Sequence, residues 1–298
     1  MKWIILSFLL LINTFLANSQ DIILTILDSI THKPLAYSSL IFLDDNVGNY
    51  SNEEGVFTSN KIGHRLRVSQ ISYNAKEIVV PNSDCIVMLQ PKPYSLDEVT
   101  IKPSDTKPSQ VGFFNKKHEF TVAGLTGDEM AVFIPNPFNN ERYLKELLIK
   151  TDANWITKSS LKIDFVSVFR VNFYLKKTNS LEPDNLQQIR SLICSSKILK
   201  KNTAINISNL NILLPTAGIF VSIEWIGIEY KNSKDLITDY KFRTEPFIST
   251  TFEQTNTVVF FRNKFLNDTW KLIDINNPYS QLTKKDNFYT PCISLMIY

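Results

Sequence analysis

The chain is poor in glycine, cysteine and histidine. Of its 298 residues, 8 are glycine, 3 are cysteine and 3 are histidine. A small fold held together by disulfides needs more cysteines than Cys85, Cys194 and Cys292. Cys194 and Cys292 lie in the same half of the chain, so two interpretations stay open. They form a bridge in an oxidising compartment, or all three cysteines are buried thiols.

All three histidines lie in the first 118 residues: His32, His64 and His118. Residues 119–298 therefore lack both the usual general base and the commonest transition-metal ligand. His118 and Glu119 begin like the helix of a zinc protease, but Val122 stands where the second histidine is required. We expect no metal site and no cofactor.

Motifs of nucleophilic catalysis and of phosphate binding are also missing. The sequence contains no Gly-x-Ser-x-Gly turn and no glycine-rich phosphate loop. A calcium loop that starts at Asp44 fails, because Asn49 and Gly55 occupy the positions that need glycine and glutamate. We therefore expect that the protein is not an enzyme.

Long apolar runs are absent except at the N-terminus. Residues 1–19 place Lys2 before the apolar run Trp3–Leu11 and end on the small residues Ala17–Ser19. This layout is typical of a secretory signal peptide, whereas a membrane anchor needs about 20 uninterrupted apolar residues. We expect an exported chain that begins near Gln20 and has no membrane span after signal cleavage. The periplasm is favoured, and association with the outer membrane and release to the cell exterior stay open.

Neither sign of charge is in large excess. The sequence has 32 Lys and Arg against 29 Asp and Glu, a net charge of +3. The cations are scattered along the chain rather than clustered, which argues against a nucleic-acid partner.

Material for a hydrophobic core is ample, at 44% hydrophobic and 12% aromatic residues. Short β-branched and aromatic runs between polar clusters predict an all-β protein with many short strands. Phe169–Lys176 alternates between apolar and other residues, which predicts a strand with one face on a core. Ile219–Trp225 is apolar on both faces and predicts a central strand in which Trp225 is buried. Further strands are predicted over Thr257–Arg262, Trp270–Ile275 and Cys292–Tyr298.

One segment has helical spacing. In Glu141–Lys150, Tyr143, Leu144 and two later leucines recur three and four residues apart, which predicts an amphipathic helix. A strand over Leu147–Lys150 is the alternative.

A change of composition divides the chain. Lys102–Gln110 contains two prolines and two serines but no large apolar residue, which is typical of a linker. We therefore expect a signal peptide over 1–19, a first domain over 21–101, a linker over 102–119 and a second domain over 120–298.

Five motifs follow one another in the first domain: Asp28–Ser38, Ser51–Phe57, Leu66–Tyr73, Val87–Leu89 and Leu96–Ile101. In this order they resemble the carboxypeptidase-regulatory-like domain, a small transthyretin-like β-sandwich of exported bacterial proteins and of the N-termini of TonB-dependent receptors. The chain departs from that family where Ile23-Leu24 replaces a usual glycine and where Ser72 replaces a frequent one. Too few residues follow for a receptor barrel, so a transporter is not expected.

Residues 120–298 look like a larger, jelly-roll-type β-sandwich, judged by their short strands and polar turns. Parts of this region are similar to uncharacterised regions of other exported β-sandwich proteins. That resemblance implies no activity.

Three residues are candidates for a ligand-binding site. Trp155 and Trp270 stand beside polar turns, where an exposed ring can stack on a sugar. Glu224 lies in an apolar strand, where burial would raise its pKa and suit it to the carboxylate pair of a glycosidase. No catalytic residue is predicted.

The hypothesis that fits these features is a non-catalytic binding or assembly module of the cell envelope, with an unknown ligand. Its partner would be a glycan or another envelope protein. The first alternative is a carbohydrate-binding protein that captures glycans, and the second is a carboxylate-based glycoside hydrolase.

Overall fold

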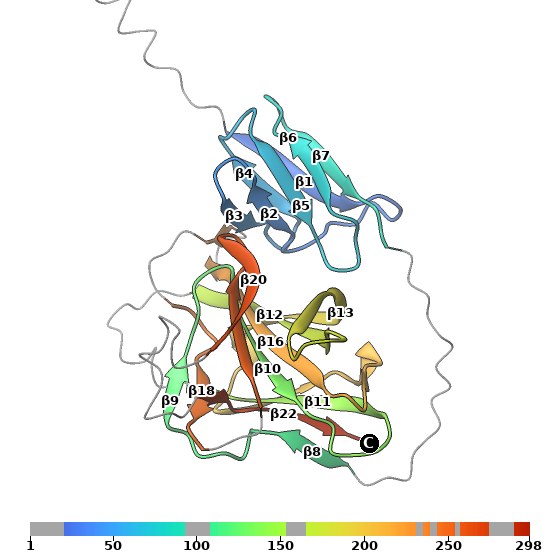
Figure 1. Cartoon of the computed structure of the whole chain (residues 1–298). Coiled ribbons are helices and arrows are strands. Elements are labelled where there is room, and N and C mark those ends of the chain that lie inside the picture. Colours follow the sequence, from blue (N-terminus) through green and yellow to red (C-terminus); the bar gives the residue numbers. More distant parts are fainter. Residues whose placement is uncertain are drawn as a thin grey trace, which may run out of the picture.

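The computed structural model describes residues 21–92, 108–152, 165–230, 235–238, 243–253, 257–273 and 289–298. In these ranges the chain forms β-strands and two 3-10 turns, η2 (Ser196–Ile198) and η3 (Ser208–Leu210), with no α-helix (Figure 1). Within the same ranges there is no helix that would serve as a membrane span. The predicted all-β, sandwich-type fold is confirmed.

Residues 21–92, the N-terminal domain, pair two small sheets around one core. The three-stranded sheet has the order β4-β1-β7 and the four-stranded sheet the order β3-β2-β5-β6. Alternate residues of the strands, such as Leu24, Leu40 and Leu66, point inward and are fully buried. The strands are β1 (Ile22–Asp28), β2 (Ser39–Phe42), β3 (Val47–Tyr50), β4 (Val56–Ser59), β5 (Arg65–Ser69), β6 (Lys76–Val79) and β7 (Cys85–Leu89).

Residues 108–298, the C-terminal domain, are built around a seven-stranded sheet of order β13-β12-β16-β10-β19-β20, with β17 paired to β16. A five-stranded sheet has the order β14-β11-β22-β8, with β15 paired to β11, and a small third sheet has the order β21-β18-β9. The strands are β8 (Ser109–Gly112), β9 (Phe120–Val122), β10 (Asp128–Ile134), β11 (Arg142–Lys150), β12 (Phe165–Lys176), β13 (Pro183–Ser195), β14 (Asn202–Asn206), β15 (Leu213–Leu214), β16 (Ile219–Tyr230), β17 (Leu236–Ile237), β18 (Ile248–Thr251), β19 (Val259–Asn263), β20 (Asn267–Leu272), β21 (Thr290–Pro291) and β22 (Ile293–Ile297).

The main core of the C-terminal domain joins the seven-stranded and five-stranded sheets. Phe169 and Val171 from β12 meet Leu147 and Leu295 of the other sheet in one buried cluster. Trp225, on the central strand β16, belongs to the same cluster and is 0% exposed, so its predicted burial is confirmed. The strands predicted over Phe169–Lys176, Ile219–Trp225, Thr257–Arg262 and Cys292–Tyr298 lie within or overlap β12, β16, β19 and β22.

The helix predicted over Glu141–Lys150 is wrong, because this segment is strand β11. The alternative, a strand over Leu147–Lys150, is confirmed, and the strand begins earlier, at Arg142. It lies between β14 and β22 and pairs with both. Its register against β22 shifts between Leu144 and Glu146, and this irregularity inserts one extra residue. The buried residues Leu144 and Leu147 therefore stand three apart in a strand and mimic helical spacing.

The predicted linker is too long at its C-terminal end. β8 pairs with β22 from Ser109 to Gly112, and Val111 of β8 is buried in the main core. The C-terminal domain therefore includes Ser109, although the sequence placed residues 102–119 in a linker.

Cys194 and Cys292 are free thiols rather than a disulfide, and both are buried. Burial raises the pKa of Cys194 to about 12 and that of Cys292 to about 11. Cys85 is also free and is partly buried.

The two domains meet in a shared apolar cluster, and Figure 1 shows β3 of the N-terminal domain close to the end of β20. Tyr37 and Tyr50 contact Ile226 and Phe265 in this cluster. The ring of Phe265 lies against Gly48, where an added Cβ would come within 1.9 Å of its Cδ1 atom. Glycine at position 48 thus allows the two domains to approach closely.

Candidate functional site

The face of the seven-stranded sheet opposite the main core carries buried polar side chains at alternate positions. A strand directs successive side chains to opposite faces, so apolar residues on one face are interleaved with polar ones on the other. Each of these polar residues is at most 4% exposed. They are Glu129 on β10, Arg170 and Asn172 on β12, Ser222 and Glu224 on β16, and Arg262 on β19.

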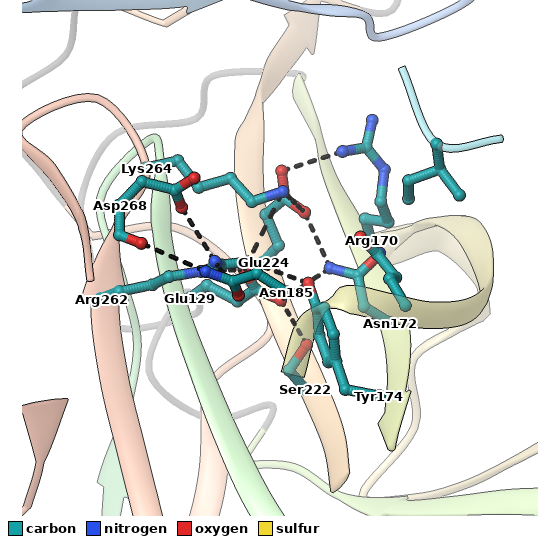
Figure 2. A network of polar contacts seen from close by, with 12 residues as sticks. Glu129, Arg170, Asn172, Tyr174, Asn185, Ser222, Glu224, Arg262, Lys264 and Asp268 are labelled. Atoms are coloured by element: carbon teal, nitrogen blue, oxygen red, sulfur yellow. Dashed lines mark hydrogen bonds and ion pairs between the residues drawn. The ribbon is translucent and has the colours of Figure 1, made fainter. Parts of the chain in front are cut away.

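Glu224 is fully buried and accepts four hydrogen bonds. Figure 2 shows it between Arg170, Asn172 and Lys264. Its Oε1 accepts from Arg170 Nη1 at 2.9 Å and from the hydroxyl of Tyr50 at 2.7 Å. Its Oε2 accepts from Asn172 Nδ2 at 2.8 Å and from Lys264 Nζ at 3.0 Å. Each oxygen of the carboxylate therefore has two donors.

Glu129 also accepts hydrogen bonds at both of its carboxylate oxygens. Its Oε2 accepts from Arg262 Nε at 2.9 Å and from Arg262 Nη2 at 2.6 Å. Its Oε1 accepts from Asn172 Nδ2 and from the hydroxyl of Tyr174, both at 2.8 Å, and from the hydroxyl of Ser222. Asn172 donates to both carboxylates and links the two halves of the network.

Both carboxylates have a lowered pKa. Burial alone raises the pKa of Glu224, but Arg170, Lys264 and the hydrogen bonds from Asn172 and Tyr50 outweigh burial. In Glu129 burial is likewise outweighed, first by Arg262 and then by Lys264. The expectation that burial would raise the pKa of Glu224 is therefore wrong, because the strand positions of the cations could not be seen in the sequence.

The ionised groups of the network balance. Arg170 and Lys264 face the two buried carboxylates, and Arg262 also lies 2.8 Å from Asp268 Oδ1. Three cations are thus matched by three carboxylates. Asp268 differs from the other two because its side chain is 59% exposed and lies at the mouth of the network.

The N-terminal domain completes the network. Besides the Tyr50 bond to Glu224, the backbone carbonyl of Tyr37 accepts a hydrogen bond from Arg170 Nη2 at 2.6 Å. The hydroxyl of Tyr37 donates to Glu229 Oε1 at 2.8 Å. Tyr37 has a φ of 53°, in the left-handed region that bulky residues rarely occupy. This strained backbone lets one residue bond the C-terminal domain through both its carbonyl and its hydroxyl.

A cleft of about 510 Å³ lies above the network, between the two domains. Its floor includes Arg170, Arg262 and Lys264, and both domains supply its walls. From the N-terminal domain come Ser39, Ser69, Gln70, Ile71, Ser72, Tyr73, Ala75 and Lys92, and from the C-terminal domain Leu175, Asn185, Gln187, Gln188, Ile189 and Asp268.

The structure places two of the three predicted site residues, Glu224 and Trp270, in the same buried network. Glu224 lies in the network beneath the cleft. Trp270 is 7% exposed, with the Arg262 guanidinium 4.1 Å from its ring centre and its Nε1 donating to Asn185 Oδ1 at 2.7 Å. It is part of the buried network and not an exposed stacking platform. Trp155 lies outside the described residues.

Sequence reasoning missed Tyr50, Arg170 and Arg262. A signal for Arg170 was present, because it and Asn172 alternate with apolar residues in β12. Alternation predicts a polar face but does not tell a buried polar face from a solvated one. Tyr50 had no signal, since its partner is 174 residues away in the chain.

No family model, no curated protein and no solved structure matches the chain. Across the described ranges, no group of three or more His, Cys, Asp or Glu residues is placed to hold a metal ion. The likeness of residues 21–101 to the carboxypeptidase-regulatory-like domain therefore stays a prediction.

Proposed function

We propose that the protein is an exported, non-catalytic binding module of the cell envelope, and that it holds its ligand in the cleft between its domains. The observation that carries this proposal is that the charged and the uncharged polar groups of the cleft have different surroundings. The ionised side chains at the floor of the cleft are bonded to one another, while uncharged hydroxyl and amide groups from both domains line its walls. Such a site is suited to binding rather than to proton transfer.

The glycoside hydrolase alternative has less support. Its general acid must hold a proton near neutral pH, so its pKa must be raised. Glu129 and Glu224 are adjacent, but the pKa of each is lowered by the arginine and lysine beside it. Neither carboxyl group lines the cleft.

Export rests on residues 1–19, which have the layout of a signal peptide. We expect protein recovered from the periplasmic fraction to begin near Gln20 when its N-terminus is sequenced. Recovery of the uncleaved chain from the cytoplasm alone would contradict export and a role in the cell envelope.

The binding role is tested by blocking the cleft. We would immobilise the mature protein, the variant Ser69→Trp in the cleft wall, and the control Ser83→Trp in an exposed turn, and pass an envelope extract over each. We expect the wild type and the Ser83 variant to retain a component that the Ser69 variant does not. Matching circular dichroism spectra would show that both variants fold. Equal retention by all three proteins, or by none, contradicts the proposal.

A further inference from the structure

We propose that the interdomain cleft recognises a neutral, polyhydroxylated ligand, the chemistry of a short oligosaccharide. This inference rests on the proposed function, since it names the class of ligand for the same cleft. It is carried by three features: a row of side chains across one sheet, the uncharged hydrogen-bonding groups of the cleft walls, and the charge balance of the floor.

The N-terminal wall of the cleft includes neighbours of Tyr50, the residue that bonds the N-terminal domain to Glu224. Tyr50, Ser39 and Ser69 stand opposite one another on β3, β2 and β5. Tyr50 reaches into the C-terminal domain and bonds Glu224, and the two serines beside it line the cleft. The docking of Tyr50 therefore places two hydroxyl groups at the edge of the ionic network.

Ser39 is the most buried serine of this wall. It is only 7% exposed, and it lines the cleft. A hydroxyl group at such a position can both donate a hydrogen bond to a ligand and accept one from it. Ser69 and Ser72 line the same wall, where Ser69 is partly exposed and Ser72 is exposed.

The opposite wall supplies amides. The side chain of Gln187 is exposed and has no hydrogen-bond partner in the described part of the chain. Gln188 donates from Nε2 to Asn172 Oδ1 at 2.8 Å, which ties it to the network. Hydroxyl and amide groups offer both donors and acceptors. Sugar hydroxyls also offer both donors and acceptors, so they can bond to every one of these groups. An ionised phosphate or carboxylate offers acceptors only.

The charge of the floor disfavours an anion. Arg170, Arg262 and Lys264 reach the cleft, but each is already paired with a carboxylate. Lys92 is the one lining cation for which the described residues provide no carboxylate. A single exposed lysine gives weak attraction in water.

The cleft also has apolar wall positions for the C–H faces of a sugar ring. Tyr73, Ile71 and Ile189 lie among the lining residues. The hydroxyl of Tyr73 donates to Asp28 Oδ2 at 2.8 Å, which fixes the orientation of its ring. The volume of about 510 Å³ lies within the usual range of small-molecule sites.

The test uses the full mature chain on an array of neutral and anionic oligosaccharides, followed by calorimetric titration of each oligosaccharide that binds. We expect neutral oligosaccharides to bind with an affinity that changes little with salt. Gln187→Ala should weaken binding by about three- to tenfold, the usual effect of one lost hydrogen bond. Gln90→Ala, an exposed control outside the cleft, should bind as the wild type does.

Two results overturn this inference. One is the absence of any bound oligosaccharide at millimolar concentration, and the other is binding only of anionic oligosaccharides that weakens steeply with salt. The proposed function has a separate readout. If Ser69→Trp loses an envelope component that is not a glycan, the ligand class is wrong and the binding role stands. If that variant loses nothing, both fail.

Discussion

At the scale of single residues, Glu224 joins the sheet, the network and the neighbouring domain through its four hydrogen bonds. Replacing it by glutamine removes the negative charge, which leaves the buried Arg170 without its carboxylate and Lys264 with only Glu129, at 3.9 Å. Breaking a buried ion pair by removing one partner costs about 3–5 kcal/mol. We expect Glu224→Gln to lose stability in this range in urea unfolding. Glu141→Gln, an exposed control, should change it by less than about 0.5 kcal/mol.

The lowered pKa values of Glu129 and Glu224 also set how stability depends on pH. A carboxyl group whose pKa is lower in the folded than in the unfolded chain, where it is about 4.3, stabilises the fold above that pH. This contribution is lost as the pH falls below it, because the unfolded chain takes up protons first. We expect the free energy of unfolding to fall steadily below about pH 4.3, and less steeply in Glu224→Gln. An identical slope in both proteins would count against the ionised network.

Trp225 tests the main core. It is 0% exposed, and its Nε1 donates to the carbonyl of Pro246 at 3.2 Å. Trp225→Ala should cost about 3–5 kcal/mol in urea unfolding, the usual range for a buried large aromatic residue. A cost below about 1 kcal/mol would mean that the side chain is not packed as described.

At the scale of elements, β3 docks the N-terminal domain through Gly48 and Tyr50. A Cβ atom at position 48 would lie 1.9 Å from Cδ1 of Phe265, and the opposite side of that ring is close to Gly127. The ring therefore has little room to move, and Gly48→Ala should cost about 1–3 kcal/mol by overpacking. The same substitution in a Phe265→Ala background should cost much less. Equal costs in the two backgrounds would show that the clash is not with this ring.

The elements also show what could be predicted from the sequence. The long strands β12 and β16 were predictable because alternation or continuous apolar character extends over most of their length. For β11 the sequence left a helix and a strand equally possible, because an irregularity gave its leucines helical spacing. β8 was not predictable, because Ser109–Gly112 contains one apolar residue and follows a proline. Its partner β22 is found only by tertiary pairing.

At the scale of the whole molecule, the candidate site belongs to neither domain alone. The N-terminal domain contributes Tyr37, Tyr50 and the serine wall, and the C-terminal domain contributes the ionic network and the amide wall. The hydrogen bonds that join the two domains here connect residues more than 100 positions apart in the chain, as Arg170 and Tyr37 are by 133. Periodicity reports on one strand at a time. The sequence therefore predicted two β-domains and Glu224 as a notable residue, but not the cleft between them.

The buried network and the Phe265 contact predict that the two domains unfold as one cooperative unit, which holds the cleft in shape. Differential scanning calorimetry of the mature chain at neutral pH tests it most directly. We expect a single transition whose calorimetric and van't Hoff enthalpies agree, and a separate, earlier transition of the N-terminal domain in Gly48→Ala. Two independent transitions in the wild type would contradict this prediction.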